Sequence, residues 1–286
     1  MRIDMKKSIA LLFSVLIVSP FLTTEAEVTA PLTIAHRGAS FDAPEHTFAA
    51  YDLAMRQQAD VIEIDLQMTR DGQLVAFHDE TLERTTDGTG LVRNQTLAQL
   101  KTLDAGSWFN DKFPERARAE FQGEQIRTLD EVLERYGHRM KLNIEMKVPE
   151  QYDGMEQKVF ESLKNHGLLA TPYLQNRRIV VESFTSDSLK KLKKLAPGLP
   201  LNQSIWKGDI SQLSDSDLDH IKSYADSVSI HYRDATEKQV RRLKSSGLLV
   251  RFYTVDDLTE MDRLSAYGVS GVYTNRPKEH IMMKSE

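Results

Sequence analysis

Short β-rich runs alternate along this chain with segments whose apolar residues recur every three or four positions. The β-rich runs number eight and cover residues 32–35, 61–66, 142–145, 179–182, 199–203, 228–231, 248–252 and 271–273. Helix-like segments lie between most of them, at 46–57, 155–165, 187–195, 214–224, 236–245 and 258–267. Alternating strands and helices indicate a parallel sheet, and eight units favour its closure. The sequence therefore predicts an α/β fold of the (β/α)8 TIM-barrel type.

The first 30 residues have the pattern of a secretory signal peptide. Two lysines precede an apolar stretch over 9–22 that a proline interrupts, and small residues follow it, with cleavage expected after Ala26 or Ala30. The stretch is too short for a spanning helix, so we expect no stable membrane insertion; a retained N-terminal anchor is the alternative. Residues 31–286 then form the mature domain of a secreted protein, close in length to the about 250 residues of one barrel.

Composition excludes several classes of protein. Hydrophobic residues make up 40% of the 286 residues, which is enough for a sizeable core. The net charge of −5 and the pI near 5.9 leave no basic footprint for nucleic acid. The chain has no cysteine, so it has neither disulfides nor a lipid anchor on cysteine. Charge and composition are those expected of a monomer.

Residues 79–128 interrupt the alternation of strands and helices. A turn-rich stretch at 85–90 precedes a short helix-like segment at 96–103 and the sequence Asp-Ala-Gly-Ser-Trp-Phe-Asn at 104–110. This segment is too long for a plain connection between a strand and a helix. We therefore expect a small inserted subdomain after the second strand, above the mouth of the barrel, where it helps to shape a pocket.

Carboxylates gather at the ends of the β-rich runs. Glu63 and Asp65 are two residues apart, so they point to the same face of their strand, and Glu145 ends another strand. Neighbouring carboxylates repel each other unless a cation or a proton lies between them. Three oxygen ligands suit Ca²⁺ or Mg²⁺. We predict one divalent cation at Glu63, Asp65 and Glu145; the alternative is a network of surface ion pairs.

Two histidines, His36 and His78, also follow β-rich runs. The pKa of histidine lies near the working pH, so one can act as a base and the other as an acid. Arg37 and Lys147 lie beside these titratable groups, and two cations there would neutralise the oxygens of a phosphate. The alternative for Lys147 is an ion pair with Glu145. The pattern points to metal-assisted phosphoryl or acyl chemistry.

The roles of five other side chains stay open from the residues alone. Glu45 and His46 precede a helix-like segment, where Glu45 either complements the helix dipole or lies near the ion, and His46 has no assigned role. Trp108, Phe184 and Tyr253 either line an apolar or cation-binding pocket or pack inside the fold.

A series of short motifs gives the chain a family resemblance. In order, these are His36-Arg37-Gly38, Pro44-Glu45-His46-Thr47, Glu63-Ile64-Asp65, Thr69-Arg70-Asp71-Gly72, Val75-Ala76-Phe77-His78-Asp79, Asn143-Ile144-Glu145-Met146-Lys147, Ser183-Phe184 and Thr274-Asn275-Arg276-Pro277. The set resembles glycerophosphodiester phosphodiesterases over about 34–277, and 104–110 resembles the insertion of secreted Gram-positive members. One departure is Tyr253-Thr254-Val255-Asp256, where Trp-Thr-Val-Asn is common in the family.

The resemblance implies a TIM barrel with an inserted subdomain and a set of site roles. Glu63, Asp65 and Glu145 would ligate a divalent ion, Ca²⁺ first and Mg²⁺ second, and Glu45 would lie near this metal site. His36 and His78 would be the acid–base pair. Arg37 and Lys147 would bind the phosphate. The departure at Tyr253 and Asp256 affects the shape of the pocket rather than the chemistry.

The predicted activity is metal-dependent hydrolysis of glycerophosphodiesters to sn-glycerol 3-phosphate and an alcohol. Deacylated phospholipids and the glycerophosphate polymers of teichoic acids are the expected substrates. A related barrel phospholipase and a non-catalytic surface protein that binds glycerophosphate are the alternatives. Which histidine is the acid, and whether water or the glycerol 2-hydroxyl attacks, stay open.

Overall fold

The structure, a computed structural model, describes residues 30–284, so the predicted leader lies outside the described residues. One sheet runs through this part of the chain. Its strands are β1 (Leu32–Ala35), β2 (Val61–Met68), β3 (Leu74–Ala76), β4 (Lys141–Met146), β5 (Ile179–Ser183), β6 (Leu201–Ser204), β7 (Ser227–His231), β8 (Leu249–Tyr253) and β9 (Gly271–Thr274).

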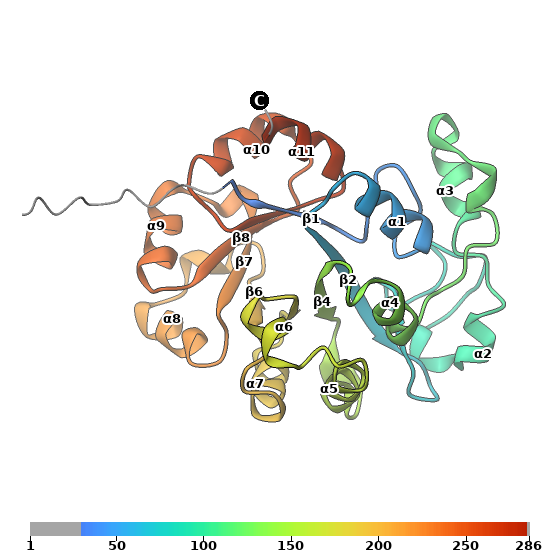
Figure 1. The fold of residues 1–286 in the computed structure, drawn as a ribbon, viewed down its shortest axis with the longest axis horizontal. Coiled ribbons are helices and arrows are strands. Elements are labelled where there is room, and N and C mark those ends of the chain that lie inside the picture. The colour runs from blue at the N-terminus through green and yellow to red at the C-terminus, as the bar shows by residue number, and fades with distance from the viewer. Residues whose placement is uncertain (1–29, 285–286) are drawn as a thin grey trace, which may run out of the picture.

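Eight of these strands are parallel and form a closed barrel. Their order is β1-β9-β8-β7-β6-β5-β4-β2, and β1 also pairs with β2, which closes the ring (Figure 1). The predicted TIM barrel is therefore confirmed. β3 is an additional short strand that pairs antiparallel with the end of β2, with Leu66 opposite Ala76.

The helices lie outside the barrel (Figure 1). They are α1 (Phe48–Arg56), α2 (Leu97–Leu100), α3 (Ser107–Lys112), α4 (Leu129–Tyr136), α5 (Met155–Asn165), α6 (Thr171–Gln175), α7 (Ser186–Leu195), α8 (Asp215–Lys222), α9 (Glu237–Ser245), α10 (Leu258–Ser265) and α11 (Pro277–Lys284). Across residues 30–284, none of these helices has the length and apolar character needed to cross a membrane.

The main core lies between the strands and these outer helices. Every residue of β2 is buried, because one face of the strand meets the helices and the other the barrel interior. β6 begins at Leu201 rather than at the predicted residue 199, after Pro200, which has no N–H to donate to a ladder. α4 was not predicted, although Thr128 and Glu131 form a capping box at its start.

The segment between β3 and α4 carries α2 and α3 and stands to one side of the barrel (Figure 1). It has small cores of its own, one around Leu82 and Leu100 and another around Phe109 and Phe121. The second core includes Ala50 of α1, so the segment is anchored on the barrel close to the end of β1.

Candidate active site

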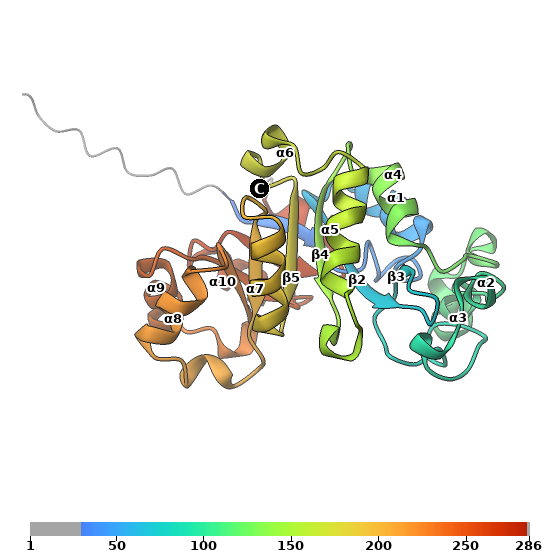
Figure 2. The ribbon, with the colours of Figure 1, turned by 90° about the horizontal axis from the view of Figure 1, so that it is seen from below.

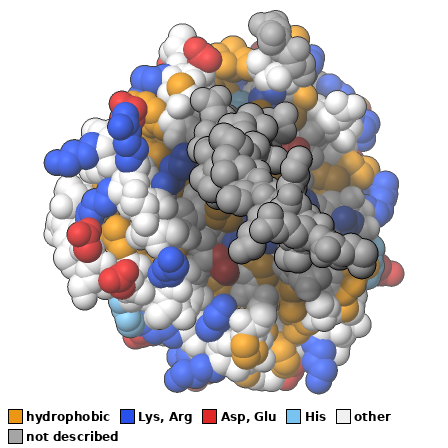
Figure 3. Space-filling view, turned by 60° about the vertical axis from the view of Figure 1, so that its left-hand side comes forward, with side chains coloured by type: hydrophobic (Ala, Val, Ile, Leu, Met, Phe, Trp, Pro, Cys, Tyr) orange, Lys and Arg blue, Asp and Glu red, His pale blue; other side chains and the backbone are white. Residues whose placement is uncertain are grey.

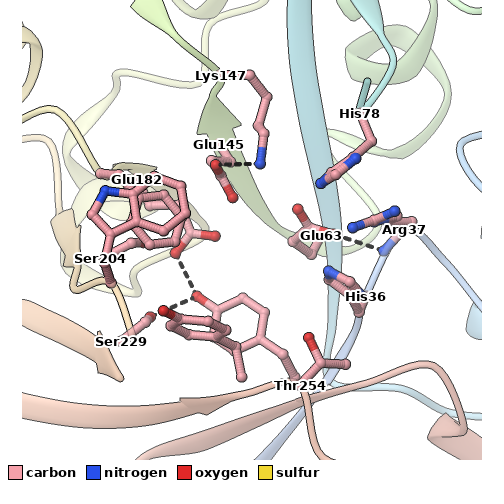
Figure 4. Close-up of a pocket in the computed structure, with 14 residues that line it drawn as sticks. His36, Arg37, Glu63, His78, Glu145, Lys147, Glu182, Ser204, Ser229 and Thr254 are labelled. Carbon is pink, nitrogen blue, oxygen red and sulfur yellow. Dashed lines mark hydrogen bonds and ion pairs between the residues drawn. The ribbon is translucent and has the colours of Figure 1, made fainter. Parts of the chain in front are cut away.

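A cavity of about 610 Å³ opens at the carboxyl ends of the barrel strands. Figure 4 shows Glu145 and Lys147 on one side of it and His78, Arg37 and His36 on the other, with Glu63 between them. The residues that line it are His36, Arg37, Glu63, His78, Glu145, Lys147, Glu182, Phe184, Ser204, Trp206, Ser229, Tyr253, Thr254 and Tyr273. Active sites of TIM barrels form at this end, where the loops after the strands converge.

Three buried carboxylates from adjacent strands form a compact cluster. One oxygen atom from each of Glu63, Asp65 and Glu145 can be chosen so that all lie within 4.8 Å of one another. Burial raises the pKa of Glu63 well above its usual value, and repulsion from Asp65 raises it further. Burial likewise raises the pKa of Glu145 to about 8, although Lys147 opposes the shift. Carboxylates that repel one another in this way, with few other partners, fit a divalent cation.

Positive and polar groups surround Asp65 in particular. His46 Nε2 lies 3.0 Å from Asp65 Oδ2, and Arg37 Nε lies 3.3 Å from the same oxygen without being aligned for a hydrogen bond. Lys147 Nζ lies 3.7 Å from Asp65 Oδ1 and 2.8 Å from Glu145 Oε1. Burial tends to raise the pKa of Asp65, but Lys147 and the His46 hydrogen bond hold it well below its usual value. Asp65 is therefore the ionised member of the cluster.

A left-handed turn after β1 places Arg37. The residue has φ 63°, and its backbone N–H donates to Glu63 Oε2 over 2.7 Å. The next residue, Gly38, has φ 86°, and a Cβ there would lie 2.8 Å from Ala50 of α1, so only glycine allows this close approach. The strained turn packs β1 onto α1 and holds the guanidinium of Arg37 against the acidic cluster.

His36 stands at the pocket wall with one ring nitrogen engaged. Its Nδ1 lies 2.8 Å from Asn275 Oδ1, which also accepts from Ser40 Oγ at 2.8 Å. Because an amide oxygen only accepts, Nδ1 carries the proton and Nε2 holds the free electron pair. Burial lowers the pKa of His36 to about 3, and Arg37 adds to this effect. His36 is therefore a neutral imidazole.

His78 has a partner of different chemistry. Its Nδ1 lies 2.6 Å from Asp79 Oδ1, and Arg84 Nε holds the other oxygen of Asp79 at 2.5 Å. Burial lowers the pKa of His78 below its usual value, and Asp65 and the hydrogen bond to Asp79 oppose this shift only in part. A carboxylate beside the ring stabilises the imidazolium far better than an amide does. The two histidines thus differ in the hydrogen-bond partner of Nδ1, which is an amide for His36 and a carboxylate for His78.

Glu45 does not line the cavity, but its carboxylate binds Arg37, which does, and Arg84. Its Oε1 accepts from Arg37 Nη1 at 3.0 Å, and both of its oxygens accept from Arg84. Burial opposes ionisation, but the Arg84 hydrogen bonds and the charge of Arg37 hold the pKa of Glu45 far below its usual value. Glu45 therefore links the Arg37 side of the site to the Asp79 side through Arg84.

Aromatic side chains form one wall of the cavity. Trp206 stacks on Phe184 with ring centroids 3.8 Å apart, and Tyr253 meets Phe184 edge-on at 5.8 Å. Trp206 is 61% exposed, so the outer part of this wall faces solvent. Phe184 and Tyr253 thus lie where the pocket interpretation put them. Trp108 does not: it packs in the core of the inserted segment, and its Nε1 donates to Ala105 O.

Sequence reasoning gave no role to six of the lining residues, among them Trp206 and Glu182. Trp206 follows β6 by two residues, and the position of a large aromatic just after a strand was the available signal. Glu182, on β5, is a fourth buried carboxylate, hydrogen bonded to Asn202 and Tyr273. Burial raises its pKa. Glu182 ends a predicted β-rich run, as Glu145 does, and this position was the signal that could have identified it.

This geometry is that of a barrel enzyme whose pocket suits acid–base chemistry on an anionic ester. The model of the glycerophosphoryl diester phosphodiesterase family matches residues 36–279. A glycerophosphodiester phosphodiesterase of Bacillus subtilis is 44% identical over 246 residues, which cover 86% of this chain and 84% of the relative. The chain belongs to the glycerophosphoryl diester phosphodiesterase family, and it is an enzyme, as its motifs predicted.

Solved structures agree with this assignment. A phosphodiesterase from Oleispira antarctica, in complex with the product sn-glycerol-3-phosphate, is 31% identical with a TM-score of 0.77 and covers 90% of this chain and 98% of its own. A glycerophosphodiester phosphodiesterase from Agrobacterium tumefaciens is 30% identical with a TM-score of 0.72, covering 88% of this chain and 99% of its own. The similarity therefore extends over whole domains.

Proposed function

We propose that this enzyme hydrolyses glycerophosphodiesters to sn-glycerol 3-phosphate and an alcohol, with His36 and His78 as the acid–base pair. The observation that carries the proposal is that both histidines line one cavity with Nδ1 held by an acceptor, Asn275 or Asp79. Each ring therefore keeps Nε2 for the substrate. The product in the Oleispira antarctica structure supports the same substrate class.

The partners of the two rings suggest which histidine has which role. His36 is neutral, since its partner is an amide and Arg37 lies beside it, so it takes a proton from the attacking hydroxyl. His78 can hold a proton against Asp79 and gives it to the leaving alkoxide. The attacking hydroxyl belongs either to water or to C2 of the glycerol. The second route forms a cyclic phosphate, which ³¹P NMR of the reaction detects.

Arg37 and Lys147 bind the non-bridging oxygens of the phosphate in this proposal. Both side chains line the cavity, and both are held in place by carboxylates, Glu45 for Arg37 and Glu145 for Lys147. Burial acts against the charge of Lys147, but Asp65 and Glu145 raise its pKa, so the lysine stays protonated. Two fixed cations stabilise the charge that develops at phosphorus.

A divalent cation completes the proposed site. Glu63, Asp65 and Glu145 are the residues that would hold it, and their all-oxygen donor set suits both Ca²⁺ and Mg²⁺. We propose Ca²⁺ first because of the resemblance to secreted members of the family. When bound, such an ion withdraws charge from a phosphate oxygen. The raised pKa values of Glu63 and Glu145, caused first by burial and then by repulsion between the carboxylates, support the assignment, because a bound cation stabilises the ionised form against both effects.

The enzyme is further proposed to be a secreted, monomeric member of the type found in Gram-positive bacteria. The predicted signal peptide at 1–30 supports secretion of a domain that begins at residue 31, with 79–128 as its insertion. N-terminal sequencing of protein from the culture medium tests the leader, and light scattering tests the monomer.

On the face that Figure 3 shows, Lys and Arg side chains are scattered rather than joined into one basic surface, in keeping with a small-molecule substrate.

Product analysis tests the proposed substrate class. The purified protein is incubated separately with glycerophosphocholine, teichoic acid and lysophosphatidylcholine, and sn-glycerol 3-phosphate is measured enzymatically. Release from glycerophosphocholine is the expected result, and release from teichoic acid adds the polymer as a substrate. Cleavage of the lysolipid alone would identify a phospholipase. Binding of glycerophosphate without turnover would identify a non-catalytic protein.

A further inference from the structure

A second cavity lies at the opposite end of the barrel, where the strands begin. It has an open mouth and a volume of about 590 Å³, and α6 lies at this end of the molecule, at the upper edge of Figure 2. The residues that line it are Leu32, Val61, Lys141, Leu142, Asn143, Gln175, Asn176, Arg177, Val180, Leu249, Arg251 and Ser270. Its charged lining residues are all cations: Lys141, Arg177 and Arg251.

Arg251, on β8, is buried without a carboxylate in contact. The side chain is 5% exposed, and no acidic group within residues 30–284 makes an ion pair with it. Its Nη1 donates to Asn143 Oδ1 over 2.8 Å, while its Nε, also buried, has no hydrogen-bond partner in the described part of the chain. Arginine is rarely buried to this degree unless it is paired. The cavity therefore contains a buried guanidinium with an unused donor.

Arg177 brings a second guanidinium to the same cavity. It precedes β5 in a left-handed conformation, with φ 48°, and its Nε and Nη2 are buried without a hydrogen bond among the described residues. The nearest acidic group is Asp226, whose Oδ2 lies 4.0 Å from Nη2 and already accepts from the backbone N–H of Leu201 at 3.0 Å. Burial lowers the pKa of Arg177, Asp226 raises it, and the nearby charge of Arg251 lowers it further.

We propose that this cavity, at the floor of the barrel, is a binding site for a small oxyanion such as phosphate or sulfate, held between Arg177 and Arg251. Guanidinium groups match the oxygens of such anions in charge and in geometry. Three nitrogen atoms of these two guanidinium groups have no hydrogen-bond partner among the described residues, and an anion held between the groups offsets the repulsion of their two like charges.

The chemistry of the lining selects this class of ligand over others. A metal cation has no carboxylate to bind among the lining residues, and an apolar ligand would leave the arginine donors unpaired. The site is at the far end of the barrel from His36 and His78, so its occupancy is separable from catalysis.

Equilibrium dialysis with labelled phosphate tests the proposal, with EDTA present and ionic strength held constant with chloride. The Lys147→Ala variant removes a phosphate partner at the active site and is expected to retain the binding at the floor of the barrel. Arg177→Ala on the same background is expected to weaken phosphate binding by about tenfold or more, since charge-assisted hydrogen bonds are lost. Phosphate should also raise the melting temperature of Lys147→Ala but not that of the double variant.

Two further variants make the test decisive. Arg242→Ala, on α9, removes an arginine of similar exposure, 33% against 34%, and should leave phosphate binding unchanged. Leu249→Glu places a carboxylate at the mouth, where the side chain is 39% exposed, and should abolish binding even if Arg177→Ala proves unstable. Turnover should stay at the wild-type rate in Arg177→Ala. Phosphate binding that disappears in Lys147→Ala, or survives in both Arg177→Ala and Leu249→Glu, overturns the proposal.

Discussion

Asp256 holds the side-chain amide of Asn275 in one orientation. Its Oδ2 accepts from Asn275 Nδ2 over 2.6 Å, and its Oδ1 accepts from the backbone N–H of Asn275 over 2.8 Å. Because a carboxylate only accepts, the amide NH₂ faces Asp256 and the amide oxygen faces His36. The departure from the common family motif at residue 256 therefore reaches His36, one of the proposed catalytic pair, through Asn275.

We expect Asp256→Asn to lower kcat about tenfold with little change in KM, as seen when groups that orient a ligand or base are altered. The new amide can donate as well as accept, so Asn275 can reverse and offer NH₂ to His36, which favours the wrong tautomer. Steady-state kinetics on glycerophosphocholine measure both constants. Asp257→Asn is the matched control, because Asp257 caps α10 and asparagine caps as well as aspartate. Equal losses in the two variants would rule out the orienting role.

His36→Ala and His78→Ala should each lower kcat by about 10²-fold or more, the usual contribution of a positioned acid or base. His220→Ala, on the outer helix α8, serves as the control and should retain wild-type turnover. Circular dichroism establishes that the variants are folded. Near-normal turnover in either histidine variant would remove that residue from the mechanism.

The stabilisation of the fold by Ca²⁺ should increase with pH up to about pH 8. Burial raises the pKa of Glu145 to about 8, whereas its value in the unfolded chain is near 4.5. Between these two pH values the folded protein holds a proton on Glu145 that the unfolded chain has lost. Raising the pH through this range therefore destabilises the metal-free protein. A cation replaces that proton. Melting temperatures with Ca²⁺ and with EDTA at pH 5, 6.5 and 8 measure the effect. Glu145→Gln should reduce the pH dependence, because the raised pKa of Glu63 contributes the rest, and a constant difference in the wild type contradicts the prediction.

Trp206→Ala should raise KM for glycerophosphocholine about threefold to tenfold and change KM for glycerophosphoglycerol much less. The exposed ring stacks on Phe184 at the pocket wall, where a quaternary ammonium group gains a cation–π contact of about 0.5–2 kcal/mol. Leu258→Ala, also exposed but on α10, is the control. Equal changes in KM for both substrates would mean that the Trp206 ring does not distinguish choline from glycerol as the leaving alcohol.

The barrel could be predicted from the sequence because its strands are short, apolar and regularly spaced. The ends of β1 and β2 also showed their chemistry directly, since His36, Glu63 and Asp65 interrupt apolar runs. α4 was missed because it follows an irregular insertion, although its capping box and the helical spacing of Leu129, Val132, Leu133 and Tyr136 were both local signals. The barrel type and the grouping of the titratable residues could thus be predicted from the sequence alone.

Contacts between distant segments could not be predicted in the same way. Asn275 meets His36 across 239 residues of sequence, and Arg251 meets Asn143 across 108. Nothing in the local pattern distinguishes these polar residues from others on strands. Trp108 takes the second of its two predicted places, since an aromatic in an insertion near the mouth packs into a local core as readily as it lines a pocket.

The most direct test of the account is the release of sn-glycerol 3-phosphate from glycerophosphocholine by EDTA-stripped enzyme, before and after Ca²⁺ or Mg²⁺ is added back. The account predicts negligible release without metal and recovery when Ca²⁺ or Mg²⁺ is added, since Glu63, Asp65 and Glu145 form an all-oxygen cluster that suits either ion. Undiminished release by the stripped enzyme would contradict the central claim that these three carboxylates serve the reaction by holding a cation.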